Sequence, residues 1–241
     1  MTARRLLVHA EGQEDRALLE ALRPHLARGE KMDLPRREHW GLRAAVTAAQ
    51  TNIEVGLPVV VVRDLDDLDV TDVNALKRWT DKQFDVVSTP LSGTTFAVGT
   101  VATNAAARRV RVAVVGCGVP DIGSRVAVTE VASFAVDDYA LWLAWQDTVY
   151  ARLENQVPVS ATQGRDALPA VVSLLRERKI AITGGKRLAQ LFRAIVGFRA
   201  APATFMTALA RCAAAEPDWH KWVEPLRTDL DQALDFISGE P

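Results

Sequence analysis

The chain has 241 residues, of which 49% are apolar and 24% are charged, and its formal net charge is −1. It is long enough for one sizeable domain with an appendage or for two smaller domains, and no stretch reaches the roughly eighteen apolar residues of a membrane span. A dedicated nucleic-acid-binding protein usually carries a basic excess, so any nucleic-acid contact here must come from locally clustered basic groups or from a partner.

The start of the chain, Met1 to Arg5, is basic and leads into a short apolar run that ends before Glu11. This run is too short for the apolar core of a secretory signal, so we expect a cytoplasmic protein that does not associate with a membrane. The two cysteines, Cys117 and Cys212, form neither a disulfide framework nor a zinc-binding spacing. We therefore expect both to be buried structural thiols.

The first half of the chain alternates between strand-like and helix-like segments. In chain order it predicts a strand at 5–10, a helix at 13–28, a charged loop at 29–39, a helix at 40–55, a strand at 59–63, a helix at 71–87 and strands at 95–103 and 110–115. The runs at 59–63 and 110–115 are rich in apolar β formers, as in central parallel strands covered on both faces. This order indicates an α/β fold with helices flanking a mainly parallel sheet.

The character of the chain changes after about residue 130, where alanine becomes abundant and strand-like runs disappear. Helices are expected at 136–153, 167–178, 186–196, 202–213 and 219–237. We therefore predict an α/β domain over residues 1–130 and a helical C-terminal region over residues 131–241, packed on the sheet or beside it.

An acidic residue, Glu11, stands at the end of the first predicted strand, and Gly12 follows it before a helix opens. Glycine permits a tight strand-to-helix turn, and ligands of parallel α/β sheets bind at the carboxyl ends of the strands. Glu11 is therefore a candidate site residue. The alternative is that Glu11, Glu14 and Asp15 simply place acids in the first turn of a helix, which is favourable without any ligand.

A second acidic feature is the run Asp64-Leu65-Asp66-Asp67, which directly follows the apolar strand at 59–63. On an extended segment, Asp64 and Asp66 can point the same way, and two facing carboxylates repel unless a cation lies between them. Hard oxygen ligands favour Mg²⁺ or Mn²⁺ over zinc. The alternative is a solvated acidic turn that caps the next helix.

Together these features resemble the Toprim domain, in which a strand–Glu-Gly–helix unit is followed by a hydrophobic strand ending in Asp-x-Asp. Here Glu11-Gly12 and, about fifty residues later, Asp64-Leu65-Asp66 supply the two motifs, and the resemblance spans roughly residues 4–120. Toprim domains serve in topoisomerases, bacterial primases and the overcoming-lysogenization-defect (OLD) class of nucleases. The resemblance implies a Toprim-like, Rossmann-like sheet in the first domain.

The chain looks most like the small stand-alone bacterial Toprim proteins, in which three further short motifs follow. The matching pieces are Val119-Pro120-Asp121, Asp137-Asp138-Tyr139 and Thr183-Gly184-Gly185-Lys186. These motifs are short and carry less weight than the first two.

The resemblance implies phosphoryl chemistry that depends on Mg²⁺ or Mn²⁺, because such a metal neutralises charge on a phosphate and lowers the pKa of an attacking water. Asp64 and Asp66 would hold the metal, and Glu11 would hold a second metal or act as a general acid or base. Asp15 matches an acidic position that follows the Glu-Gly turn in OLD-like members, and is a further metal-ligand candidate.

Three less specific candidates complete the predicted site. Asp138, or its neighbour Asp137, could add a carboxylate to the second metal, although acids also favour a helix start by themselves. Lys186 follows two glycines and could act in catalysis by offsetting charge on a phosphate, but a full phosphate-binding loop is absent. A basic loop containing Arg36 and Arg37 could contact a nucleic-acid backbone, or be an ordinary solvated loop.

Two features of Toprim enzymes that this chain lacks reduce the number of functions that the resemblance implies. A topoisomerase needs a transesterifying tyrosine, whereas Tyr139 and Tyr150 lie in a helix that reads as core, and primase-type zinc ligands are missing. The expected function is therefore that of a metal-dependent nuclease that acts on DNA or RNA, for instance in anti-phage defence. The first alternative is a non-catalytic Toprim-like subunit that works in a complex with a protein partner or as a homo-oligomer.

The second alternative is a phosphatase, because Asp64-Leu65-Asp66-Asp67 also resembles the nucleophile motif of haloacid-dehalogenase phosphatases. In that family the first aspartate is phosphorylated and the second acts as acid and base. Those chains normally place this strand first and have a threonine or valine at the fifth motif position, where this chain has Leu68. We therefore rank this alternative below the Toprim resemblance.

Overall fold

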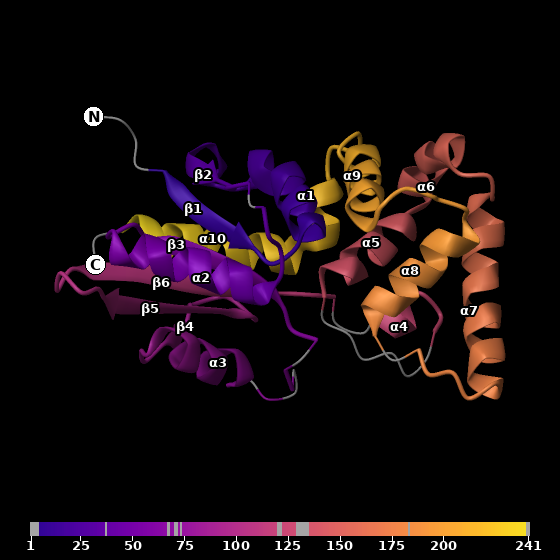
Figure 1. Ribbon diagram of the computed structural model, residues 1–241. Coiled ribbons are helices and arrows are strands. Elements are labelled where there is room, and N and C mark those ends of the chain that lie inside the picture. The colour runs from indigo at the N-terminus through magenta and orange to yellow at the C-terminus, as the bar shows by residue number, and fades with distance from the viewer. Residues whose placement is uncertain are drawn as a thin grey trace. The chain divides into compact units, whose positions relative to one another are not determined.

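The computed structural model describes residues 5–239 except 37, 67, 70, 71, 73, 120, 121, 129–134 and 183, and except the side chains of 155 and 161. The chain forms two compact units (Figure 1): unit 1 comprises Met1–Cys117 and Val223–Pro241, and unit 2 comprises Gly118–Trp222. Within the described residues, the β-sheet belongs to unit 1 and unit 2 is helical.

In the part of unit 1 that the structure describes, six strands form a sheet that helices cover. The strands are β1 (Leu6–Ala10), β2 (Met32–Asp33), β3 (Val59–Asp64), β4 (Thr89–Pro90), β5 (Ala97–Thr103) and β6 (Arg109–Cys117). The helices are α1 (Gln13–Leu22), α2 (Leu42–Glu54), α3 (Ala75–Phe84) and α10 (Glu224–Ser238), with short 3₁₀ turns η1 (Arg23–His25) and η2 (Gly29–Lys31).

The strands form one sheet in the order β2-β1-β3-β6-β5-β4. Strands β2, β1, β3 and β6 are parallel to one another. Strand β5 is antiparallel to β6, and β4 is antiparallel to β5. The four valines 59–62 of β3 are completely buried at the centre of the sheet. This confirms the prediction of a mainly parallel sheet flanked by helices, since β-branched runs suit strands that are covered on both faces.

Helices cover both faces of this sheet. Helix α2 packs on β1 and β3, and α10 packs across β1, β3, β5 and β6 on the opposite face (Figure 1). In α10 the buried carboxylate of Asp229 accepts the backbone N–H groups of Thr95 and Phe96, at 3.0 and 3.2 Å, just before β5 begins. Helix α10 follows the helices of unit 2 in the chain but belongs to unit 1.

Two local features differ from the expected elements of unit 1. The helix that begins at Gln13 ends at Leu22 instead of residue 28, because Pro24 lacks a backbone N–H, and the chain continues as the 3₁₀ turn η1. Strands β2 and β4 were not expected. Each has two residues, which is too short for an alternating pattern to be visible in the sequence.

Within the described residues, unit 2 is built from helices of 4 to 17 residues. They are α4 (Ile122–Arg125), α5 (Val136–Ala144), α6 (Asp147–Leu153), α7 (Ala161–Glu177), α8 (Gly185–Ile195) and α9 (Pro202–Ala213), with 3₁₀ turns η3 (Glu154–Gln156) and η4 (Trp219–Val223), the latter ending at the unit boundary. Helix α5 packs against α8 and α9, α6 packs against α9, and α7 packs against α8.

The single helix expected at 136–153 is two helices, α5 and α6. The break falls at Gln146, whose backbone is extended, and Asp147 then provides an acid in the first turn of α6. In the part of the chain that the structure describes, none of the helices combines the length and apolar character needed to cross a membrane.

Candidate metal centre

Asp64 and Cys117 come side by side because of the register between β3 and β6. These strands are parallel neighbours, and Asp64 pairs with Cys117 at the last position of each strand. Paired residues of neighbouring parallel strands direct their side chains to the same face of the sheet, with the strands about 5 Å apart. A carboxylate and a thiol therefore share the carboxyl-terminal edge of the sheet, where ligands bind in open α/β folds.

The third member of this group, Asp15, comes from the first turn of α1. Its Oδ2 accepts the backbone N–H of Gly12, the residue before the helix, at 2.7 Å. A Cβ atom on Gly12 would lie 2.8 Å from the same oxygen. The absence of a side chain at Gly12 thus lets the Asp15 carboxylate fold back over the start of the helix.

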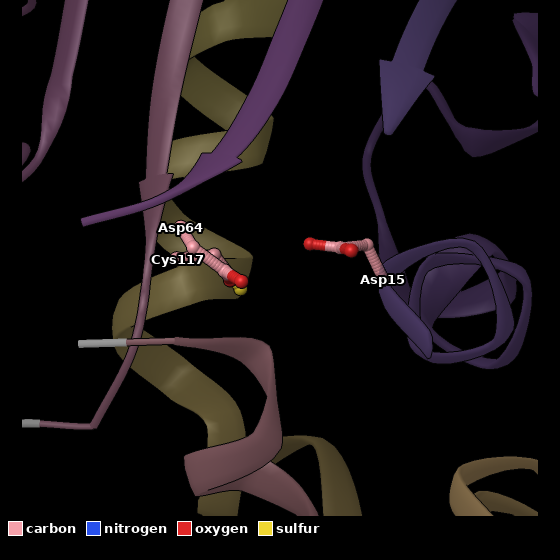
Figure 2. A group of neighbouring side chains, drawn as sticks. All are labelled: Asp15, Asp64 and Cys117. Carbon is pink, nitrogen blue, oxygen red and sulfur yellow. The ribbon is translucent and has the colours of Figure 1, made fainter. Parts of the chain in front are cut away.

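The three side chains form a compact buried group. One carboxylate oxygen of Asp15, one of Asp64 and the Sγ of Cys117 all lie within 4.8 Å of one another. Figure 2 shows the Asp15 side chain extending from its helix toward Asp64 and Cys117. The exposed fractions of the three residues are 2%, 7% and 1%. Carboxylates and thiols are metal ligands, so this group could hold a metal ion.

Burial makes the charge of Asp15 costly. It raises the pKa of the Asp15 carboxyl to about 7; the hydrogen bond from Gly12 opposes this rise, and the nearby charges of Glu11 and Glu14 add to it. A buried carboxyl with such a pKa holds a proton near neutrality unless a cation replaces it. The group is therefore suited to exchange a proton for a metal ion.

One oxygen of Asp15 has unused hydrogen-bonding capacity. While Oδ2 accepts the Gly12 N–H, the buried Oδ1 has no hydrogen-bond partner among the residues that the structure describes. Buried polar atoms are nearly always paired, so an unpaired carboxylate oxygen in such a place points to a bound proton, water or ion.

Glu11 lies beside this group and supports it. Its backbone N–H donates to the carbonyl of Val62 at 3.0 Å, and its Oε2 accepts the backbone N–H of Asp64 at 3.1 Å. The carbonyl of Asp64 accepts a hydrogen bond from Nε of Arg63 at 2.7 Å. The backbone of Asp64 is thus held by hydrogen bonds at both its N–H and its C=O. These bonds fix the position from which the Asp64 side chain extends.

Two other predicted residues of unit 1, Asp66 and Arg36, lie at the surface. Asp66, in the turn after β3, is exposed and is not one of the three clustered ligands. Arg36 is exposed in the loop between β2 and α2. Arg37 and Asp67 lie outside the described residues.

The predicted residues of unit 2 have different surroundings. Asp138 is completely buried, and its Oδ2 accepts the N–H groups of Val119 and Ala135, so it caps the start of α5. Lys186 is exposed in the first turn of α8. Of the short motifs in this region, Pro120-Asp121 and Thr183 lie outside the described residues.

Cys117 was expected to be a structural thiol, and its place beside two carboxylates was not expected from the sequence. The signal that could have found it is the strand register. Cys117 ends an apolar strand, as Asp64 does. Only the pairing of β3 with β6 shows that these two last residues lie opposite each other.

Comparison of the chain with protein-family models, with curated proteins and with solved structures gives no match. The interpretation of the site therefore rests on its geometry and chemistry.

Proposed function

We propose that the protein is a Toprim-type nuclease that hydrolyses phosphodiester bonds with the help of Mg²⁺ or Mn²⁺. The observation that supports this most directly is the convergence of Asp15 and Asp64, two buried carboxylates from different elements, at the carboxyl edge of a parallel sheet. Two such groups are stable together when a cation or a proton lies between them.

In this proposal Asp15 and Asp64 hold the cation, and the exposed Asp66 is a further ligand at the surface. The bound cation would neutralise charge on a phosphate and lower the pKa of a water molecule. The carboxylate of Glu11 accepts the backbone N–H of Asp64 and so helps to orient it. In this proposal Glu11 is the general acid or base, or a ligand of a second metal. Arg36 and Arg37 are the proposed contacts to the backbone of DNA or RNA. Lys186 is a proposed catalytic residue that offsets charge on a phosphate.

The test begins with metal binding. Isothermal titration with Mn²⁺ and Mg²⁺ should detect a site in the wild type that Asp15→Asn and Asp64→Asn weaken at least about tenfold, because each removes an anionic ligand. The matched control is Asp85→Asn. Asp85 is exposed in the same unit, and its backbone is left-handed with φ 51°, a conformation that asparagine tolerates. This variant should bind metal as the wild type does.

Cleavage is measured next with labelled single-stranded and double-stranded DNA and RNA. The wild type and Asp85→Asn should cleave one of these substrates when Mn²⁺ or Mg²⁺ is present and stop when a chelator is added, and Asp64→Asn should be at least about a hundredfold slower. Absence of metal binding in the wild type would refute the metal centre itself.

Two other outcomes would point to the alternatives. Metal binding without cleavage of any nucleic acid would favour a non-catalytic Toprim-like subunit in a complex, in keeping with the net charge of −1. A beryllofluoride adduct on Asp64, together with hydrolysis of phosphate monoesters, would favour a phosphatase of the haloacid-dehalogenase type.

A further inference from the structure

We propose that Cys117 is a direct ligand of the bound cation, so that the site also binds thiophilic divalent ions such as Zn²⁺ or Co²⁺ tightly and, of the two ions of the proposed nuclease, favours Mn²⁺ over Mg²⁺. This inference rests on the metal centre of the proposed function, but not on nuclease activity. It concerns the identity of the ion, which two carboxylates alone leave open.

The position of the thiol carries the first step. Cys117 is 1% exposed, and its Sγ lies within 4.8 Å of carboxylate oxygens of both Asp15 and Asp64. In a four-coordinate site with ligand bonds of 2.0–2.3 Å, neighbouring ligand atoms are about 3.5 Å apart. The three atoms are therefore close enough to reach one ion with small side-chain adjustments.

The second step comes from Asp15, which is independent of the thiol. Its buried Oδ1 has no hydrogen-bond partner among the described residues, and the side chain extends toward Asp64 and Cys117 (Figure 2). Its other oxygen is held by the Gly12 N–H. A carboxylate fixed through one oxygen with the other left for an ion is the usual arrangement of an oriented metal ligand.

The third step is the chemistry of the ligand set. Mg²⁺ takes oxygen ligands and keeps its waters, whereas a thiolate selects softer ions such as Zn²⁺ and Co²⁺. When the ion binds, a sulfur–metal bond forms and the Cys117 thiol loses its proton to solvent. Three protein ligands leave a coordination position for water, as in catalytic zinc sites.

Cys212 provides a matched control, because it is also a buried thiol. It lies in α9 of unit 2, and burial raises its pKa. Among the described residues, the group of clustered metal-ligand side chains contains Cys117 and not Cys212.

The test is a Co²⁺ titration of the full-length protein, followed by absorption spectroscopy, since a cobalt–thiolate bond gives a charge-transfer band. The wild type and Cys212→Ser should develop this band up to one equivalent of Co²⁺. Both Cys117→Ser and Cys117→Ala should lose it and bind Co²⁺ and Zn²⁺ at least about tenfold more weakly, with a much smaller change for Mg²⁺. Circular dichroism verifies that each variant is folded, and the two substitutions guard against a packing defect in one of them.

The outcomes separate this inference from the proposed function. If Co²⁺ or Mn²⁺ binds in a manner that Asp64→Asn weakens, but without a charge-transfer band, Cys117 is not a ligand and the metal-dependent nuclease proposal stands. A band that persists in the folded Cys117→Ser protein also overturns the inference. If none of these ions binds the wild type, both proposals fail.

Discussion

At the scale of single residues, the candidate site depends on Gly12 and Asp15 acting together. The glycine leaves the space in which the Asp15 carboxylate folds back, and its N–H holds one oxygen of that carboxylate. The other oxygen has no hydrogen-bond partner among the described residues, and the side chain as a whole extends toward Asp64 and Cys117 (Figure 2). A change at Gly12 should therefore act on the site without removing any ligand.

We expect Gly12→Ala to weaken Mn²⁺ binding about tenfold, because the new Cβ would displace the Asp15 carboxylate. The backbone of Gly12, with φ −118°, is one that alanine adopts readily, so the free energy of unfolding should change by only about 1 kcal/mol. The measurement is titration calorimetry beside chemical unfolding. Gly184→Ala is the matched control, because Gly184 also precedes a helix but has no atom within 4 Å of an added Cβ.

The pKa of Asp15 predicts how stability depends on pH in the metal-free protein. Because the folded-state pKa is about 7 and the unfolded value is 3.8, the folded state keeps the proton over this interval and the unfolded state loses it. The contribution of Asp15 to stability therefore falls as pH rises from about 4 to about 7, by an amount on the order of a few kcal/mol.

Asp15→Asn removes this titration. The free energy of unfolding of the variant relative to the wild type should therefore increase between pH 5 and pH 8, roughly following the titration of Asp15. Urea unfolding at several pH values, with a chelator present, measures this difference. Adding Mn²⁺ at pH 8 should stabilise the wild type and leave the variant almost unchanged. A difference that does not vary with pH would show that Asp15 titrates normally.

At the scale of elements, the site depends on how closely β6 approaches the segment after β3. A Cβ on Gly116 would lie 2.6 to 2.8 Å from atoms of the Leu65 side chain. Gly116 pairs with Arg63, one position before Asp64 and Cys117 pair. Glycine at this position thus lets the buried Leu65, which directly follows Asp64 in the chain, pack over β6.

We expect Gly116→Ala to lower the free energy of unfolding by about 1–3 kcal/mol, because the buried Leu65 must move. Since Leu65 directly follows Asp64, metal affinity should also fall. The double variant Gly116→Ala/Leu65→Ala relieves the clash, so its loss of stability should be smaller than the sum of the two single losses. Urea unfolding of the four proteins measures the coupling; purely additive losses would mean that the two residues do not interact.

At the scale of the whole molecule, unit 1 is discontinuous in sequence. Its last helix, α10, follows the helices of unit 2 along the chain and then covers four strands of the sheet. The carboxylate of Asp229 joins this helix to the start of β5, and burial raises its pKa to about 6 against the opposing effect of two N–H donors. We therefore expect the sheet and its last helix to unfold as one cooperative structure.

Removal of α10 by truncation after Trp222 should accordingly prevent unit 1 from folding stably and abolish metal binding, because a broad apolar face of the sheet becomes exposed. Circular dichroism and Mn²⁺ titration measure both effects. Asp229→Asn is the milder comparison: it keeps the helix but weakens one of the two N–H contacts, and should cost about 1–2 kcal/mol while metal binding persists. A truncated protein that still folds and binds metal would contradict this role of α10.

The sequence by itself determined the α/β class and the central parallel strands, and it singled out Asp15 and Asp64 among its acidic candidates. Buried runs such as 59–62 and the strand-to-helix turn at Gly12 carry local signals, since β-branched residues suit covered strands and glycine suits tight turns. The tertiary structure decided which carboxylates meet. Asp15 joins Asp64 through the fold of α1, whereas Asp66, which is closer in sequence, points to the surface.

The tertiary structure also decided the third member of the candidate metal-binding group and the place of the last helix. Cys117 lies 53 residues from Asp64 in the chain, and only the register of β3 with β6 brings them together. Likewise, α10 resembles the other C-terminal helices in composition, but it packs on the sheet of unit 1. Both depend on pairing and packing between distant segments, which local sequence patterns do not record.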